Sequence, residues 1–168
     1  MILEVLSSLY YIFPAYCANA APVIFGGGHP IDCNKKFCDG KPIFGSHKTI
    51  RGFLSGIVIG VLVGWVQESL TPIIGVHGGG VILGLALSFG ALVGDLLGSF
   101  IKRRLGMEPG SHLPVSDQID FVLVALLFGY LVKPISLTQT IIIIVLTGPI
   151  HVIVNFFAYL LRLKDTPW

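Results

Sequence analysis

Long apolar runs separated by shorter polar stretches dominate this chain. The runs cover about residues 2–25, 53–66, 79–100, 118–133 and 138–161. A helix needs roughly 20 apolar residues to cross the hydrocarbon core of a membrane. The pattern therefore predicts an all-α, polytopic membrane protein with about five transmembrane helices. We expect residues 1–168 to form a single integral-membrane domain.

The composition supports a membrane protein and excludes several other classes. Of the 168 residues, 54% are hydrophobic and only 12% are charged, whereas a soluble domain is about a quarter charged. A net charge of +2 gives no indication of nucleic-acid binding. The three cysteines are an odd number, so they cannot all pair in a disulfide framework.

Two long polar loops are expected at residues 26–52 and 101–117. Together with the C-terminal tail they contain ten of the eleven Lys and Arg residues, and Lys133 is the exception. Short cytoplasmic loops of membrane proteins are enriched in Lys and Arg. We therefore expect a multi-pass protein of the cell membrane, with these loops and the C-terminus in the cytoplasm and the N-terminus outside.

Glycines recur every four residues in two of the expected spans. Gly52, Gly56, Gly60 and Gly64 follow this spacing, and so do Gly90, Gly94 and Gly98. Small residues at this interval let helix backbones approach closely in lipid. Close packing is the favoured interpretation, and room for a ligand beside a helix is the alternative.

Three acidic residues lie where the apolar spans meet the basic loops. Asp95 lies inside an apolar run, and a carboxylate within a span is by default a functional candidate. Asp117 and Asp120 share one face at the start of the following helix. Singly, they are equally well explained as helix-terminus charges or as partners of the basic cluster 102–104. Together they suit Mg²⁺, which binds carboxylates and substrate phosphates.

The first loop has the composition of a phosphate-binding segment. Residues 34–52 are basic and rich in turn-forming residues, and Lys41, Lys48 and Arg51 are candidate phosphate ligands. The GxxxxGK[ST] pattern of a P-loop is absent. A solvated loop that only sets membrane topology is the alternative. A loop of about 27 residues favours a function, because structureless loops this long are uncommon.

Histidines and cysteines give weaker indications. Cys33 and Cys38 have four residues between them, which is not a strong zinc spacing, so free thiols are expected. His151 lies within the last apolar run near Asn155. It is expected either to form buried hydrogen bonds or to line a cavity for a lipid head group.

The chain resembles a known family over nearly its whole length, and three segments carry the resemblance. They are DGKPIFGSHKTIRG (39–52), GDLLGSFIKRR (94–104) and LPVSDQID (113–120). All three are similar to archaeal CDP-archaeol synthases. A more distant resemblance to CDP-diacylglycerol synthases rests on SFIKR (99–103) and DQID (117–120). The chain departs from that family in lacking its His-Gly-Gly stretch and in having Gln118 where Arg is usual.

The resemblance implies a CTP-dependent cytidylyltransferase that requires Mg²⁺. Its substrates would be CTP and 2,3-di-O-geranylgeranyl-glycerol 1-phosphate, a prenylated ether lipid, and its products CDP-archaeol and pyrophosphate. We expect the metal ligands to be Asp95, Asp117 and Asp120, and these acids to be catalytic together with Lys102. The expected nucleotide and phosphate contacts are Asn34, Asp39, Lys41, Lys48, Thr49, Arg51, Lys102 and Arg103.

Three alternatives remain open at this point. A related enzyme could act on another lipid phosphate, as the distant resemblance suggests. A small ion or solute transporter would use Asp95 alone, but it would leave the long basic loop unexplained. A purely structural membrane subunit would give the clustered charges no use. The sequence does not determine the oligomeric state.

Overall fold

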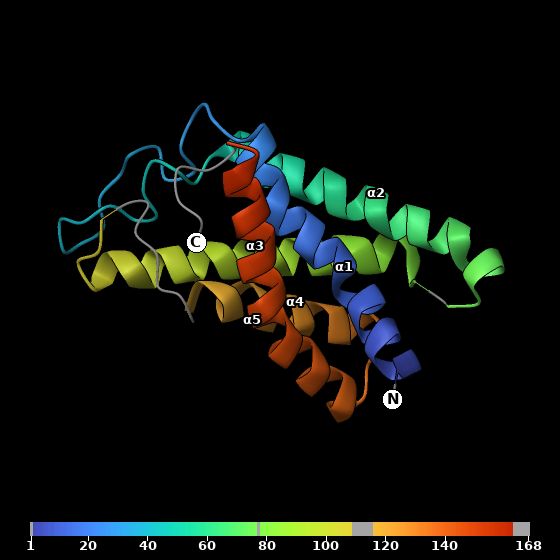
Figure 1. Cartoon of the computed structure of the whole chain (residues 1–168). Coiled ribbons are helices and arrows are strands. Elements are labelled where there is room, and N and C mark those ends of the chain that lie inside the picture. The colour runs from blue at the N-terminus through green and yellow to red at the C-terminus, as the bar shows by residue number, and fades with distance from the viewer. Residues whose placement is uncertain (1, 77, 109–115, 163–168) are drawn as a thin grey trace.

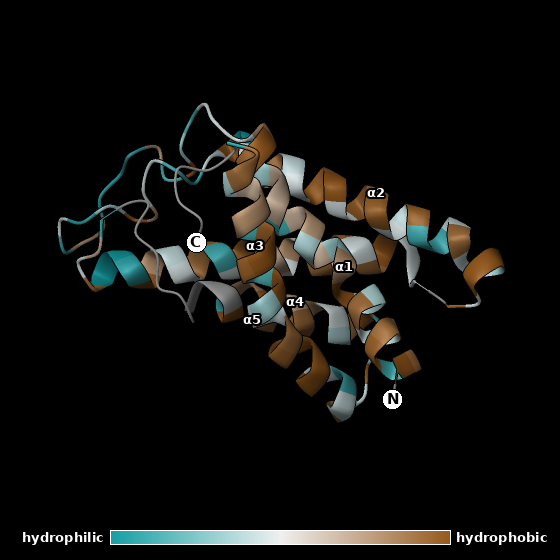
Figure 2. Ribbon diagram, in the orientation of Figure 1, coloured by the Kyte–Doolittle hydropathy of each residue, from teal (hydrophilic) through white to brown (hydrophobic). Residues whose placement is uncertain are grey.

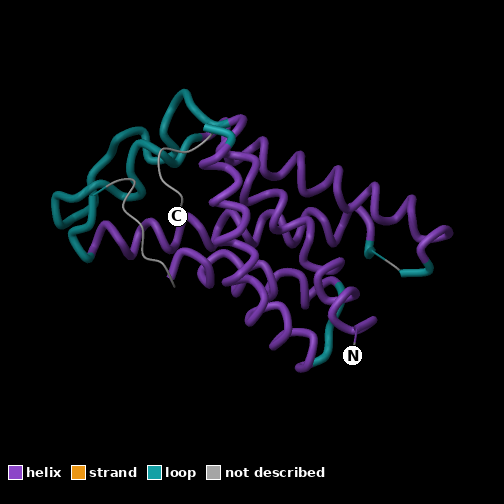
Figure 3. The backbone as a smooth tube through the Cα atoms, viewed as in Figure 1, coloured by secondary structure: helices purple, strands orange, loops and turns teal. Residues whose placement is uncertain are grey.

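The computed structural model describes residues 2–76, 78–108 and 116–162 of this chain, without the side chains of 116–118. Within these residues the named elements are all helices, as predicted, and Figure 3 shows them joined by loops. Figure 1 shows the helices α1 (Ile2–Phe25), α2 (Ile50–Ile74), α3 (Gly80–Arg104), α4 (Ser116–Val132) and α5 (Leu137–Leu160). Lys164, counted above among the basic residues, lies outside the described residues.

The helices consist largely of apolar residues (Figure 2). Among the described helices, α2, α3 and α5 are long and apolar enough to cross a membrane, and the apolar part of α4 is shorter, at Ile119–Val132. Side chains such as Ile73 and Leu131 are 80% and 76% exposed. Exposed apolar surface on this scale suits contact with lipid rather than water. α1 continues through Pro14 and Pro22 without a break.

α3 lies at the centre of the bundle, where it packs against α1, α2 and α4. The buried core joins α1, α3, α4 and α5 through Ile12, Leu83, Leu87, Val122 and Ile143, among others. The glycines of α2 and α3 make this packing close. A Cβ atom at Gly84 would come within 3.1 Å of the Cα of Gly64, and one at Gly94 within 2.7 Å of the Cα of Phe121. The packing interpretation of these glycines is therefore confirmed.

The helices extend beyond the apolar runs of the sequence. α2 ends at Ile74 rather than near residue 66, and α3 continues to Arg104. The extra turns of α2 include Gln67, which is 4% exposed and whose amide donates to the carbonyl of Tyr10 at 2.7 Å. The apolar pattern predicts only the part of a helix that faces lipid. A helix can continue beyond that part when its buried polar side chains have hydrogen-bond partners, as Gln67 does.

One end of the bundle carries most of the polar structure. The loop 26–49 covers the C-terminal end of α3, as Figure 1 shows at the left, and Figure 2 colours both segments as hydrophilic. Two isolated bridges, Pro30 with Thr49 and Lys36 with Pro42, fold the loop back on itself. This charged end is where the candidate site lies.

Candidate active site at the charged end of the bundle

A cavity of about 720 Å³ opens at the charged end. Among the described helices, α5 packs only against α1 and α4 and leaves a gap opposite α2 and α3. The cavity fills this gap, and loop 26–49 contributes to its wall. Its polar lining consists of Tyr16, Asn19, His47, Lys48, Thr49, Asp95, Ser99, Lys102, Arg103, Thr147, His151 and Asn155.

Lys48 and Asp95 form an ion pair inside this cavity. The Lys48 ammonium lies 2.6 and 2.8 Å from the two carboxylate oxygens of Asp95, and both side chains are about one-third exposed or less. The backbone around Lys48 is fixed, because its carbonyl accepts from the Ile31 amide at 2.8 Å. The pair therefore joins the first loop to α3 across 47 residues of sequence.

Thr49 follows Lys48 and begins α2. Its hydroxyl accepts from the Gly52 amide at 3.1 Å, which is the usual arrangement of an N-cap. Thr49 is 7% exposed. Thr49 lines the cavity, and its hydroxyl oxygen accepts the hydrogen bond that starts α2. Its predicted contact with a phosphate stays a prediction.

The last turns of α3 contribute cations to the same wall. Asp95, Ser99, Lys102 and Arg103 follow at helical spacing and all line the cavity. Arg103 is only 3% exposed. Because a guanidinium stays protonated, Arg103 gives this wall a fixed positive charge, which suits the binding of phosphate groups.

Asp120 packs directly against α3. A Cβ atom at Gly98 would collide with the Asp120 carboxylate, so the absence of a side chain there makes room for it. Gly98 follows Asp95 by three residues and lies on the same side of α3. Asp120 does not line the cavity itself.

Asp117 lies one turn before Asp120 on α4, and its side chain is outside the described residues. The described side chains alone contain no group of three His, Cys, Asp or Glu residues placed to hold a metal. The predicted set of three acids therefore stays a prediction.

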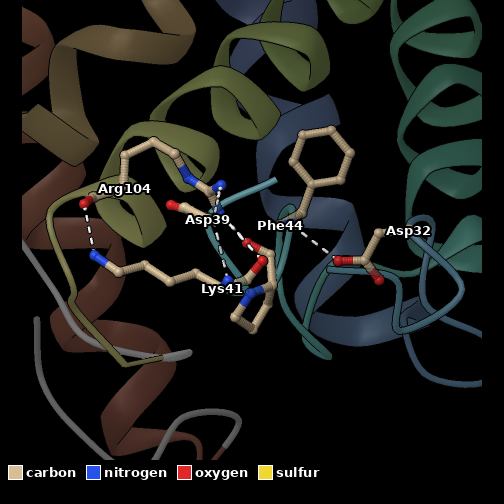
Figure 4. Close-up of polar contacts among 6 residues, drawn as sticks. Asp32, Asp39, Lys41, Phe44 and Arg104 are labelled. Atoms are coloured by element: carbon tan, nitrogen blue, oxygen red, sulfur yellow. Dashed lines mark hydrogen bonds and ion pairs between the residues drawn. The ribbon is translucent and has the colours of Figure 1, made fainter. Parts of the chain in front are cut away.

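Other predicted residues lie at the outside of the loop (Figure 4). The Arg104 guanidinium pairs with the Asp39 carboxylate at 2.7 Å and donates to the carbonyl of Pro42, and the Lys41 ammonium donates to the Arg104 carbonyl at 2.9 Å. Arg104 also lies over the rings of Phe37 and Phe100, at 4.9 and 4.8 Å from their centroids. We call Asp39, Lys41 and Arg104 the outer clamp.

The structure thus divides the predicted nucleotide-binding residues into two groups. Lys48, Thr49, Lys102 and Arg103 line the cavity, together with Asp95. The residues that do not line it are Asn34, Asp39, Lys41 and Arg51. Their predicted contacts with CTP remain untested.

Sequence reasoning missed Asp32, which organises the loop. Its side chain accepts from the backbone amides of Asn34, Phe44 and Gly45 at 2.9–3.0 Å, and the residue is 6% exposed. Burial alone would raise the pKa of Asp32, but these amides outweigh burial and the pKa is lowered. The available indication was local: Asp side chains often bind the amide two residues later, in turns.

The cavity also contains uncharged polar groups from α1 and α5. The Tyr16 hydroxyl and the Thr147 hydroxyl lie 2.8 Å apart, and the Asn155 amide lies 3.3 Å from the His151 ring. His151 thus both contacts Asn155, as its first interpretation expected, and lines the cavity; a lipid head group at this place stays a prediction. The four-residue spacing of Thr147, His151 and Asn155 along α5 was the pattern that could have revealed this row.

Comparison with known proteins supports a single family. A family model described as CarS-like, CDP-archaeol synthase, matches residues 1–168. The chain is 49% identical over 162 residues to the CDP-archaeol synthase of Thermococcus gammatolerans, covering 96% of this chain and 95% of that one. It is 47% identical over 170 residues to that of Methanocaldococcus jannaschii, covering 96% of each.

A solved structure shares the fold. It is the structure of an intramembrane enzyme for archaeal membrane lipid biosynthesis, with a TM-score of 0.80 and 33% sequence identity. The match covers 90% of this chain and 94% of that chain. The arrangement of the described helices around a charged cavity and the similarity along the whole sequence lead to one conclusion: this chain belongs to the CDP-archaeol synthase family.

Proposed function

We propose that this protein transfers the cytidylyl group of CTP to the phosphate of a prenylated glycerol ether lipid. The products would be CDP-archaeol and pyrophosphate. The observation that carries the proposal is the cavity between α5 and α3. Lys48, Asp95 and Lys102 line one side of it, and apolar side chains such as Val154 and Phe157 line the other. Such a cavity suits the meeting of a charged nucleotide with a lipid phosphate.

The reaction needs positioning and charge neutralisation more than proton transfer. An oxygen of the lipid phosphate is already an anion, so it attacks the α-phosphorus of CTP without a strong base. The new P–O bond forms as the bond to the β-phosphate oxygen breaks, and pyrophosphate leaves with the electron pair. Lys48, Lys102 and Arg103 would neutralise the phosphates, which is the main task of an enzyme in such chemistry.

The acids on α3 and α4 fit a Mg²⁺ ion in their chemistry. Carboxylate oxygens are ligands that Mg²⁺ prefers. Gly98, one turn after Asp95 on α3, leaves room for the Asp120 carboxylate of α4. We propose Asp95, Asp117 and Asp120 as its ligands, direct or through water. When bound, the ion would supply further positive charge beside the phosphates.

The same proposal assigns an orientation in the membrane. CTP is a soluble nucleotide, so the charged end must face the compartment that supplies it. The excess of Lys and Arg in loop 26–52 and near residues 102–104 favours the cytoplasm. The C-terminus would then be cytoplasmic and the N-terminus outside.

The purified protein in detergent, with CTP labelled at the α-phosphate and Mg²⁺, tests the function. We expect the label to enter a geranylgeranyl ether lipid phosphate with equal release of pyrophosphate, and not to enter glycerol 1-phosphate. Chelation of Mg²⁺ and the variant Asp120→Asn should each lower turnover by about 100-fold or more. Thermal unfolding of the variant checks that it is folded.

Each part of the proposal can fail separately. Transfer to no lipid phosphate at all would refute the activity, and faster transfer to a diacyl lipid phosphate would refute the substrate. Ion flux in liposomes without consumption of CTP would favour the transporter alternative. Near-normal turnover by Asp120→Asn would remove that carboxylate from the mechanism.

A further inference from the structure

Asn19 is an uncharged polar residue within the apolar helix α1. Its side chain lines the cavity and is partly buried, between the buried Ala18 and Ala21. Among the described residues, no side chain or backbone group forms a hydrogen bond with its carboxamide. Asn side chains in membrane helices usually bond across to a neighbouring helix. A partly buried polar group without such a bond is costly and calls for an explanation.

The neighbouring polar groups of the cavity are already engaged. The Tyr16 hydroxyl, one turn before Asn19, lies 2.8 Å from the Thr147 hydroxyl, which itself donates to the Ile143 carbonyl at 2.6 Å. Since a hydroxyl has one hydrogen, Tyr16 must donate to Thr147. The Asn19 carboxamide, in contrast, has two N–H donors that it can offer to a ligand. The other α1 residues of the lining are apolar: Ala20, Pro22, Val23 and Ile24.

The packing of α1 against α2 and α3 places Asn19 further from the charged end than Asp95. A Cβ atom at Gly56 would come within 2.7 Å of the Ala18 carbonyl oxygen and 2.8 Å of the Leu92 Cδ1 atom. Ala18 and Leu92 therefore lie at the same height in the bundle. Leu92 precedes Asp95 by three residues, and α3 runs towards the charged end. Asn19 thus lies about one helical turn inward of Asp95.

Under the proposed function, the cations of the lining give the triphosphate of CTP a direction. Lys48 pairs with Asp95, and Lys102 and Arg103 follow two turns later on α3. A triphosphate bound along this row would have its α-phosphate beside Lys48, and pyrophosphate would leave towards the charged end. The attacking and leaving oxygens of a phosphoryl transfer lie roughly in line. The lipid phosphate must therefore approach from the inner side, where Asn19 lies.

We propose that the Asn19 carboxamide donates to the phosphate of the lipid substrate and holds it in line with the α-phosphorus of CTP. The inference rests on the proposed function, whose reaction it deepens. A lipid phosphate oxygen forms the new P–O bond as the bond to the β-phosphate oxygen breaks, and the electron pair leaves with pyrophosphate. Asn19 transfers no proton. An uncharged donor suits this place, because a cation would lower the basicity of the attacking oxygen.

Binding to the full-length protein in detergent, without CTP, tests the contact. The probes are the prenylated glycerol ether lipid with its phosphate and the same lipid with a free hydroxyl, and thermal shifts report their affinities. Asn19→Leu should bind the lipid phosphate about tenfold more weakly, because a hydrogen bond to a charged group is lost, and the lipid alcohol equally well. Asn19→Asp should bind the phosphate more weakly still, because it adds a negative charge. Asn19→Gln should retain part of the affinity.

Steady-state rates give the second readout. Asn19→Leu should raise the KM for the lipid phosphate and leave the KM for CTP unchanged. Without ligand it should unfold at no lower a temperature than the wild type, since no contact with a described residue is removed. Cys17→Ser is the matched control, because Cys17 lies on α1 outside the lining. It should leave both KM values and the thermal shifts unchanged.

The inference and the proposed function can fail separately. If the wild type transfers no label, the proposed function fails, while the thermal shifts still test the contact. Unchanged affinity of Asn19→Leu for the lipid phosphate, or equal weakening for the phosphate and the alcohol, would overturn the inference. A raised KM for CTP alone would also overturn it and would place Asn19 beside the nucleotide.

Discussion

Two stretches of the same basic loop have different surroundings. Asp39 and Lys41 belong to the outer clamp, where both contact Arg104 at the end of α3. Residues 47–49 line the cavity, where the Lys48 ammonium pairs with Asp95. In the sequence, Lys41 and Lys48 are equivalent candidates for phosphate binding. Two lysines of one loop therefore have different roles: Lys41 holds the loop against α3, and Lys48 lines the cavity.

The difference comes from how the loop is held. The Asp32 carboxylate accepts hydrogen bonds from the amides of Phe44 and Gly45. These two residues lie in the sequence between the outer clamp residues of the loop and the residues that line the cavity. The backbone bonds of His29 with Ile50 and of Ile31 with Lys48 then fix the segment that enters the cavity. Lys48, which follows this turn, enters the cavity, whereas Lys41, which precedes it, does not.

Among these predictions, the largest loss of activity is expected from a substitution at Lys48. Lys48→Met removes the ammonium from the cavity and should lower kcat/KM by about 100-fold, because a positioned cation beside the reacting phosphates is lost. Lys41→Met is the matched change in the outer clamp and should cost less than about threefold, since it acts only through Arg104. Steady-state rates of both variants test the division, and equal losses would contradict it.

Asp32→Asn should produce the next largest effect, on stability rather than chemistry. The amide replaces a carboxylate that accepts three backbone bonds, so the free energy of unfolding should fall by about 1–3 kcal/mol. Thermal unfolding in detergent measures the loss. Asp39→Asn is the comparison and should cost less, because that carboxylate accepts one backbone bond and its ion pair with Arg104 is partly exposed.

The same residue predicts a pH dependence. Because the pKa of Asp32 is lowered in the folded protein, its contribution is present above its ordinary value of about 4 and is lost as the pH falls through the lowered pKa. The stability difference between wild type and Asp32→Asn should therefore shrink below about pH 4. A difference that is constant from pH 7 to pH 3 would argue against this role.

The smallest effect on stability and activity is expected from a substitution in the outer clamp. Arg104→Ala removes the contacts with Phe37, Phe100 and Asp39 and should destabilise the loop by about 1 kcal/mol. We expect a several-fold rise in the KM for CTP with little change in kcat, because the loop is loosened but the cavity groups remain. Hydrogen exchange of residues 36–44 reports the loosening, and Arg104→Lys should restore only part of it. A fall in kcat alone would place Arg104 in the site.

Much of the fold was predictable because apolar patterning has a direct physical cause. Lipid requires long apolar helices, so the runs near Ile82 and Ile142 predicted spans without knowledge of their partners. Glycines four residues apart likewise predicted close contacts, and Gly64 and Gly84 make them. Helix ends were less predictable: α2 continues past its apolar run through Gln67, whose partner lies on α1.

The candidate site was only partly predictable. Asp95 was found because a carboxylate in an apolar run is costly and rare. Asp32 and Asn155 were not, since an ordinary Asp in a loop and an Asn in a span acquire meaning only from the groups around them. Thr49 was predicted to bind phosphate; it lines the cavity, and its hydroxyl caps α2.

By itself, the sequence determined that this chain folds as membrane helices with their charges at one end, because transfer of side chains between water and lipid depends on the residue type alone. Its long motifs also identified the family. Only the tertiary structure decided which charges meet. Lys48 reaches Asp95 and Lys41 does not, because hydrogen bonds and ion pairs act over a few ångströms and depend on how distant segments pack.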